Sequence, residues 1–403
     1  MMTVDPLIGI AGPISLPLLD AHLPRAPDAP DGMGGIPVTH LVQGLLDAGE
    51  RVSVYTLAPT VSTPITLRGE RLTVYVGPFR KQRRMRDFMR QERQHIQAFV
   101  RRDAPALVHA HWTYEYALGA LATDRPTITT VHDWAPEILA QQRDAYRFGR
   151  LLMSAATLLK GRHFIANSPY IQDRLQRWVR SPVPVIPNAV NEALFRAPDR
   201  PSPEQPPVLV SVNNGFGRRK NVKTLLRAFS SIRGSIPGCR LRLVGAWYEP
   251  DGPAAAWADK HQLAEGVTFL GPLPYEQTID EIRSASLLVH PALEESFGMT
   301  LLEAMAVGTP VVAGAESGAV PWVTGDGAAA LLTDVTRPAP LATAVCGLLG
   351  DAARWAALAE TAHQHAWSHF RLSAVVKRHL EAYHTLLNPD ERSRSEAPVS
   401  TPS

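Results

Sequence analysis

Short strand-like apolar runs alternate along the chain with longer segments whose apolar residues recur at helical spacing. Leu7–Ala11, Arg51–Thr56 and Thr127–Val131 are such runs in the first half, and Val208–Val212 and Val311–Ala313 in the second. Runs of this kind are typical of strands buried on both faces of a parallel sheet, with helices as the connections. The pattern therefore predicts an α/β protein built from βαβ units throughout.

A proline-rich stretch from Ala197 to Pro207 interrupts this alternation near its middle. A chain of 403 residues is too long for one ordinary core and suits two domains. Because proline-rich segments form extended linkers, we place residues 1–200 in one domain and residues 201–370 in a second. Residues 389–403 are expected to be a disordered tail.

Composition narrows the classes of function. Hydrophobic residues make up 45% and charged residues 20%, and a net charge of +3 is too small to indicate a nucleic-acid partner. Only Cys239 and Cys346 are present, which excludes a disulfide framework and a cysteine-rich metal site. The apolar stretch Leu7–Leu19 contains two prolines and is shorter than the roughly 20 residues that a membrane span needs. We therefore expect a cytoplasmic protein, and peripheral attachment to the inner membrane face stays open.

The stretch from His290 to Trp322 contains a loop, a short helix and a buried strand. Met299–Val307 has apolar residues at helical spacing between two glycine breaks, and Val311–Ala313 follows as a strand. Backbone N–H groups at the start of such a helix attract anions, phosphate above all. The residues that would offer these groups are Phe297, Gly298, Met299 and Thr300.

Two carboxylates flank this helix start. Glu295 precedes it and Glu303 lies inside it. In one unbroken helix eight residues would separate them by roughly 12 Å along the axis, so the break at Gly298 is what lets both face one ligand. Carboxylates can bind hydroxyl groups and backbone amides can bind phosphate. Together they indicate a nucleotide or sugar-phosphate site. An ordinary helix start with surface glutamates is the alternative.

This combination resembles the donor-site motif of glycosyltransferase family 4, the retaining sugar transferases of GT-B fold. The resemblance rests on the Glu-x7-Glu spacing from Glu295 to Glu303, the internal Ser-Phe-Gly and the closing Glu-Ala-Met-Ala-x-Gly-Thr-Pro-Val-Val. It implies two doubly wound Rossmann-like domains facing across a cleft, with residues 371–388 as a helix that crosses back to the first domain. It also implies that Glu303 holds ribose hydroxyls and Glu295 the donor hexose.

A glycine-rich turn with three adjacent cations follows the strand Val208–Val212. Arg218, Arg219 and Lys220 precede a helix start, where fixed positive charge suits a diphosphate without a metal. A solvated basic turn is the alternative. The resemblance assigns Lys220 to the diphosphate. The family's partner arginine falls where this chain has Gly215, so Arg218 or Arg219 is expected to replace it.

A second glycine loop opens the helix that follows the first strand. Gly34 and Gly35 allow a backbone to approach a ligand closely, and the helix start again suits a phosphate. A dinucleotide fingerprint would need a glycine where Pro37 stands, so we reject a nicotinamide site. The resemblance places Gly34 and Gly35 over the donor diphosphate.

Two strands of the first half deliver histidines from their carboxyl ends. These are His111 and, after Thr127–Val131, His132. Doubly wound sheets bind ligands at such strand ends. The spacing does not fit a zinc site, so we interpret both as hydrogen-bonding groups for sugar or acceptor hydroxyls, with structural histidines as the alternative. The resemblance makes His132 the acceptor-side residue.

Residues 80–102 hold nine basic residues against Asp87 and Glu92, which predicts a basic helix. It is either a solvated surface helix or a contact for anionic lipid or a phosphorylated acceptor. A nucleic-acid role is not expected, because no aromatic platform for bases accompanies it.

By resemblance, these features predict a metal-independent, retaining transferase that moves a hexosyl group from a nucleoside-diphosphate sugar to a hydroxyl acceptor. No cofactor is expected, and no Asp-x-Asp metal motif is present. The alternatives are a sugar-nucleotide epimerase of similar fold, a glycoside hydrolase with Glu295 and Glu303 as its acid pair, and a non-catalytic sugar-nucleotide binding protein.

Overall fold

The computed structural model describes residues 6–24, 29–195, 203 and 205–388. The chain divides into two compact units: unit 1 holds residues up to 167, residues 171–189 and residues from 372 onward, and unit 2 holds residues 168–170 and 190–371.

The division between the units lies at residue 190 rather than at the expected boundary of 201. Val190 donates a backbone hydrogen bond to Phe370 O at 3.2 Å and forms a β-bridge with Arg371, which ties the chain from this residue onward to unit 2. Most of the predicted linker at 197–207 lies outside the described residues, as does the predicted tail at 389–403.

Unit 1 is built on a seven-stranded sheet of order β3-β4-β2-β1-β5-β6-β7, in which only the β3–β4 pair is antiparallel. The chain runs from β1 outward to β2 and returns on the other side at β5, so the direction of winding switches between β1 and β5. The strands are β1 (Ile8–Ala11), β2 (Val52–Ala58), β3 (Ile65–Arg68), β4 (Leu72–Pro78), β5 (Leu107–His111), β6 (Thr127–Val131) and β7 (His163–Ala166).

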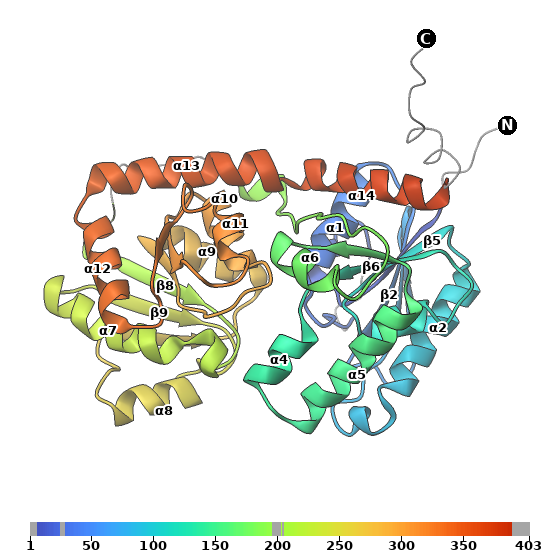
Figure 1. The fold of residues 1–403 in the computed structure, drawn as a ribbon, viewed down its shortest axis with the longest axis horizontal. Helices are drawn as coiled ribbons and strands as arrows, with labels where there is room; N and C mark the ends of the chain where they lie inside the picture. Colours follow the sequence, from blue (N-terminus) through green and yellow to red (C-terminus); the bar gives the residue numbers. More distant parts are fainter. Residues whose placement is uncertain (1–5, 25–28, 196–202, 204, 389–403) are drawn as a thin grey trace, which may run out of the picture. The chain divides into compact units, whose positions relative to one another are not determined.

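Helices cover both faces of this sheet (Figure 1). One face packs against α1 (Ile36–Asp47) and α14 (Leu372–Leu387), and the other against α2 (Arg90–Asp103) and α3 (Glu115–Ala120), while α5 (Ala145–Lys160) packs against α3. The C-terminal helix expected at 371–388 is α14, and it lies against α1. A Cβ at Gly44 of α1 would fall 2.5 Å from Val376, so this close contact between the two helices requires a glycine.

The sequence pattern of residues 138–160 predicts one helix, but the structure forms two in this region, α4 (Ala135–Gln141) and α5. The break follows from Asp144, whose side chain accepts a hydrogen bond from Arg147 N and caps the start of α5. α6 (Pro169–Leu175) follows β7.

The basic helix expected at 80–102 is shorter than predicted. α2 begins at Arg90, and only a 3-10 turn, Arg84–Asp87, precedes it. Arg80 pairs with Asp87 at 2.8 Å and with the buried Glu92 at 2.6 Å, which folds the segment back on itself.

Unit 2 is built on a six-stranded sheet of order β10-β9-β8-β11-β12-β13, with every neighbouring pair parallel. Two cores enclose it: one packs α9, α10 and α11 on one face, and the other packs α7, α8 and α12 on the opposite face (Figure 1). The strands are β8 (Val208–Val212), β9 (Arg240–Val244), β10 (Val267–Gly271), β11 (Leu287–His290), β12 (Val311–Gly314) and β13 (Leu331–Thr333). The helices are α7 (Val222–Ser235), α8 (Pro253–Lys260), α9 (Tyr275–Ser284), α10 (Met299–Ala306), α11 (Val320–Val323), α12 (Pro338–Leu349) and α13 (Ala352–Phe370).

Within the described ranges, no single helix is both long and apolar enough to cross a membrane. α12 and α13 meet the conditions of length and apolar character only as a pair, and they are bent by 98° at their junction. In the same residues, no group of three or more His, Cys, Asp or Glu side chains is arranged to hold a metal ion.

Candidate functional site

The winding of the unit 2 sheet switches direction between β8 and β11, and the loops after these two strands meet there. Open α/β sheets bind ligands at such a switch point, outside the carboxyl ends of the strands. Leu293 N of the loop after β11 donates a hydrogen bond to Arg219 O of the loop after β8 at 2.8 Å. The loop pairing fixes the two predicted motifs side by side.

Two consecutive ion pairs join these loops. Lys220 Nζ lies 2.5 Å from Glu295 Oε1, and Arg219 Nη1 lies 3.3 Å from Glu294 Oε2. Arg218, the third predicted cation, is exposed and makes no ion pair within the described part of the chain. The structure therefore brings together Lys220, Arg219 and Glu295, and adds Glu294, which the sequence reasoning missed.

Asn221 locks the base of the cationic turn. It adopts a left-handed conformation, with φ of 53°, between the turn and α7. Its amide donates to Pro291 O at 3.0 Å and to Val335 O at 2.7 Å, while its carbonyl oxygen accepts from the Thr224 hydroxyl at 2.7 Å. The side chain of Asn221 thus ties the start of α7 to the loop that carries Glu295.

Gly318 and Ala319 also hold the backbone of Glu295 in place. Ala319 N donates to Glu295 O at 2.8 Å, and Gly318 forms a β-bridge with Glu295. Gly318 has φ of +67°, and a Cβ there would collide with Glu295 O. Ser168 adds a hydrogen bond from its hydroxyl to Ser296 O at 2.6 Å.

α10 begins at Met299, as the sequence predicted, after Gly298 in a left-handed conformation with φ of 94°. The backbone N–H groups of Phe297, Gly298, Met299 and Thr300 make no hydrogen bond within the described residues. The Phe297 ring is buried edge-on against Phe370, with ring centroids 5.8 Å apart. Phe297 therefore offers its backbone and not its side chain to a ligand.

The environment of Glu295 keeps it ionised. Burial would raise its pKa, but Lys220 first, then His290 and Arg219, lower it well below the usual range. His290 Nε2 lies 3.2 Å from the same carboxylate oxygen as Lys220. For Glu294 burial prevails and raises the pKa, although Arg219 opposes the shift.

Glu303 lies on the buried side of α10 and interacts with the Tyr275 hydroxyl at the start of α9. Burial raises the pKa of Glu303 to about 7, although the Tyr275 hydrogen bond opposes the shift. Glu303 is thus a carboxyl group whose charge near neutral pH depends on what hydrogen bonds it receives.

Unit 1 carries the remaining predicted residues. Gly34 and Gly35 adopt left-handed conformations with φ of 81° and 77°, and Gly35 is the N-cap of α1. A Cβ at Gly35 would collide with Pro13 O, whereas one at Gly34 would meet nothing within 4 Å. Gly35 therefore serves the packing of the loop, and Gly34 faces open space.

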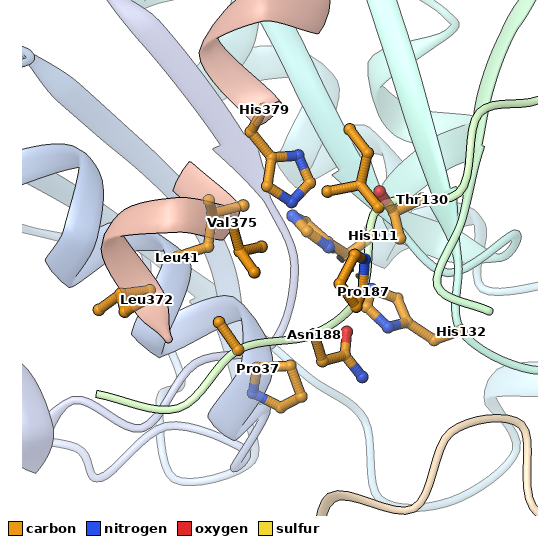
Figure 2. Close-up of a pocket in the computed structure, with 12 residues that line it drawn as sticks. Pro37, Leu41, His111, Thr130, His132, Pro187, Asn188, Leu372, Val375 and His379 are labelled. Carbon is orange, nitrogen blue, oxygen red and sulfur yellow. Dashed lines mark hydrogen bonds between the residues drawn. The ribbon is translucent and has the colours of Figure 1, made fainter. Parts of the chain in front are cut away.

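A cluster of histidines lines a small cavity in unit 1 (Figure 2). His111 Nδ1 and His132 Nε2 are 2.9 Å apart, and the His132 ring lies 4.3 Å from Trp112. The cavity volume of about 20 Å³ has room for one water molecule. Two buried ring nitrogens, His111 Nε2 and His379 Nδ1, have no hydrogen-bond partner within the described residues.

Burial keeps this cluster neutral. It lowers the pKa of His132 and of His379 to about 3, and it holds the pKa of His111 well below its usual range. His132 can therefore donate or accept a hydrogen bond, but it does not supply a positive charge.

Two of the residues that sequence reasoning missed in unit 2, His290 and Glu294, carry recognisable sequence signals. His290 ends β11 as His111 ends β5, so the strand-end rule applied to His111 also finds His290. Glu294 and Glu295 are adjacent, as are the two cations that they pair with. Tyr275 gives no comparable signal, since only the sheet order brings α9 beside α10.

Two family models match this chain. Residues 35–194 match the family model described as Glycosyltransferase Family 4, and residues 195–365 match the model described as Glycosyl transferases group 1. The chain belongs to glycosyltransferase family 4. The family that the Glu295–Glu303 motif indicated is thereby confirmed.

Named relatives of this family 4 chain include the D-inositol 3-phosphate glycosyltransferase of Rhodococcus opacus, 30% identical over 291 residues. That match spans 65% of this chain and 64% of the relative's length. Sucrose-phosphate synthase from Thermosynechococcus elongatus has a similar structure, with a TM-score of 0.75 at 21% identity over 96% of this chain and 100% of that one. Anabaena HepE in complex with UDP and glucose gives 0.68 at 19% identity, over 94% and 100%. These likenesses and the two parallel sheets confirm the predicted GT-B fold.

Proposed function

We propose that this protein is a retaining glycosyltransferase that moves a hexosyl group from a nucleoside-diphosphate sugar to a hydroxyl acceptor. The observation that carries the proposal is the charge arrangement at the ends of β8 and β11, where Lys220 and Arg219 face Glu295 and Glu294. Beside them lie the backbone N–H groups at the start of α10, which make no hydrogen bond in the described part of the chain. Family membership supports the reaction class, and the complex of the structurally similar HepE with UDP and glucose supports the donor class.

The donor would bind to unit 2. Lys220 and the amides at the start of α10 would contact the diphosphate, with Arg219 as the replacement for the family's missing arginine because it lies beside Lys220. Glu295 would accept hydrogen bonds from the hexose hydroxyls, and Glu303 from the ribose hydroxyls. The exposed Arg218 would then play a lesser part than Arg219.

The chemistry would depend on stabilising the leaving group. The bond between the anomeric carbon and the β-phosphate oxygen breaks, and a bond to the acceptor oxygen forms on the same face of the sugar. The acceptor proton passes to the departing phosphate oxygen. Lys220 and the α10 amides are fixed before the reaction and aim at the charge that develops, which is the arrangement that lowers such a barrier. This assigns charge neutralisation to protein groups rather than to a metal.

The acceptor would be held by unit 1. His132 is neutral and positioned by His111, so it suits a sugar or polyol hydroxyl. Gly34 has open space around it, so its backbone would let a bound ligand approach closely. The protein would act in the cytoplasm.

The deciding experiment combines binding with product analysis. A thermal-shift panel of UDP, GDP and ADP, each with its glucose conjugate, should show one nucleotide that raises the unfolding temperature. With that donor and a mixture of polyol and sugar acceptors, proton NMR should show a new glycoside with the anomeric configuration of the donor. Absence of any nucleotide shift would overturn the donor site. A new sugar nucleotide formed without acceptor would instead identify an epimerase.

A further inference from the structure

Helix α5 of unit 1 presents an apolar stripe to solvent. Phe148, Leu152, Ala155 and Leu159 are spaced by four, three and four residues, so they share one face. Phe148 is 53% exposed, Leu152 43% and Leu159 87%. The opposite face, which includes Met153, is buried. Because the outer face of a surface helix normally carries polar residues, this stripe indicates a partner.

Phe88 is exposed as well, and the turn that precedes it packs along α5. Met85 would contact a Cβ at Gly149 of α5, and Arg84 lies over the Tyr146 ring at 5.1 Å. Phe88 itself is 42% exposed. The surface thus combines one face of α5 with the turn that precedes α2.

Cations border this surface at both ends. Lys160 and Arg162 follow the stripe, and both are exposed. Lys81, Arg83 and Arg86 are exposed at the other end, near the first turn of α5. None of these five makes an ion pair within the described ranges, so their charge is available to a partner.

The acidic residues of the same segments are neutralised. Asp87 and Glu92 pair with Arg80, and Asp144 pairs with Arg147 at 2.7 Å. The surface therefore presents apolar side chains inside a field of unbalanced positive charge. This combination is the one by which an interfacial helix binds an anionic bilayer.

We propose that α5 and the Phe88 turn form a docking surface for anionic lipid membranes. The stripe from Phe148 to Leu159 extends for roughly 16 Å along the helix and would lie in the plane of the interface, with the bordering cations at the level of the headgroups. The apolar face of α2 cannot serve this purpose, because Ile96, Phe99 and Val100 are buried in unit 1. A symmetric dimer through the stripe would bring the two sets of cations together, which argues against a second copy as the occupant.

Vesicle sedimentation tests this surface directly. The full chain is mixed with vesicles of phosphatidylcholine alone or of phosphatidylcholine with phosphatidylglycerol. The variant Leu152→Glu/Leu159→Glu places two carboxylates in the stripe. Trp367→Glu is the matched control, since Trp367 of α13 is 44% exposed and lies outside this surface. Thermal unfolding of each variant checks that it is folded.

The wild type should sediment with the phosphatidylglycerol vesicles only, and added salt should weaken the binding. The stripe variant should lose affinity by about tenfold or more, because it removes apolar contact and adds like charge to the lipid. Trp367→Glu should bind as the wild type does. Equal binding by the stripe variant, or no binding by the wild type, would overturn the proposal. A wild-type dimer that the stripe variant dissociates would identify a second copy as the occupant and overturn it as well. None of these outcomes depends on the reaction proposed above.

Discussion

Replacing Lys220 by methionine removes the cation 2.5 Å from Glu295 while keeping most of the side-chain volume. The two side chains are only 14% and 12% exposed, so solvent screens their charges weakly. Removing one preorganised donor from a developing oxyanion costs about 10²–10³ in kcat, or roughly 3–4 kcal/mol of barrier. We therefore expect nucleoside-diphosphate release by Lys220→Met to slow by about 10²–10³, with a smaller change in KM.

The same substitution should also affect folding. It leaves Glu295 buried, with His290 Nε2 at 3.2 Å and Arg219 as groups that still favour the charged carboxylate. Without Lys220 the desolvation of Glu295 is offset only by His290 and Arg219, so its pKa should rise. We expect a loss of about 1–3 kcal/mol of unfolding free energy at neutral pH. Since the carboxyl becomes protonated as the pH falls, the loss should shrink toward the acidic side of the range.

A double variant separates the structural and catalytic roles of this pair. Lys220→Met/Glu295→Gln removes both charges, so unfolding free energy should recover toward the wild-type value while activity stays low. Lys223→Met is the matched control, because Lys223 is exposed on α7 and lies over the Phe216 ring at 5.1 Å. Urea unfolding and a nucleotide-release assay measure the two quantities. Wild-type kcat in Lys220→Met, or activity that returns with stability in the double variant, would refute the electrostatic role.

Three further predictions test other parts of the two sites. Glu303, whose pKa lies at about 7, should release a proton when ribose hydroxyls bind it, so nucleotide affinity should rise with pH up to about that value and flatten above it. Calorimetry in buffers of different ionisation enthalpy measures this proton, and Glu303→Gln should abolish the dependence. Gly318→Ala should cost about 1–3 kcal/mol of unfolding free energy and displace Glu295, whereas Gly347→Ala on an exposed position of α12 should be neutral or stabilising in the same urea titration. His111→Asn should keep more activity than His111→Leu at equal donor affinity, because the asparagine amide can stand in for Nδ1 beside His132; equal kcat for both variants would contradict this positioning role.

The loop, helix and strand around Glu295 could be predicted because each sequence signal for them spans only a few residues. The helix period from Met299, the glycine break before it and the apolar run of β12 all lie within one stretch, and α10 begins where the sequence places it. Gly298 could be read as a break because its left-handed conformation is one that glycine adopts at little cost. The partners of Glu295 were harder to foresee, since Lys220 is 75 residues away and only the adjacency of β8 and β11 brings the two together.

The separation of α4 from α5 shows a second limit of predicting helices from the spacing of apolar residues. Apolar residues at helical spacing lie on both sides of the polar residues 141–144, so the pattern favours one helix. The side chain of Asp144 instead bonds Arg147 N and starts a new helix, a local competition that period alone does not record. The Asp144 cap also fixes where α5 begins, and so where its exposed stripe lies.

The positive charge that a basic segment offers to a ligand depends on which of its cations already form ion pairs. The sequence presents Arg218, Arg219 and Lys220 as equivalent, but in the structure the last two pair with Glu294 and Glu295 and only Arg218 is free of ion pairs in the described chain. The two cations beside the proposed phosphate position are thus balanced by two carboxylates before any ligand binds. The uncompensated positive potential there comes from Arg218 and from the backbone N–H groups at the start of α10. A diphosphate would be favoured because it can share Lys220 with Glu295 while it also accepts hydrogen bonds from these N–H groups.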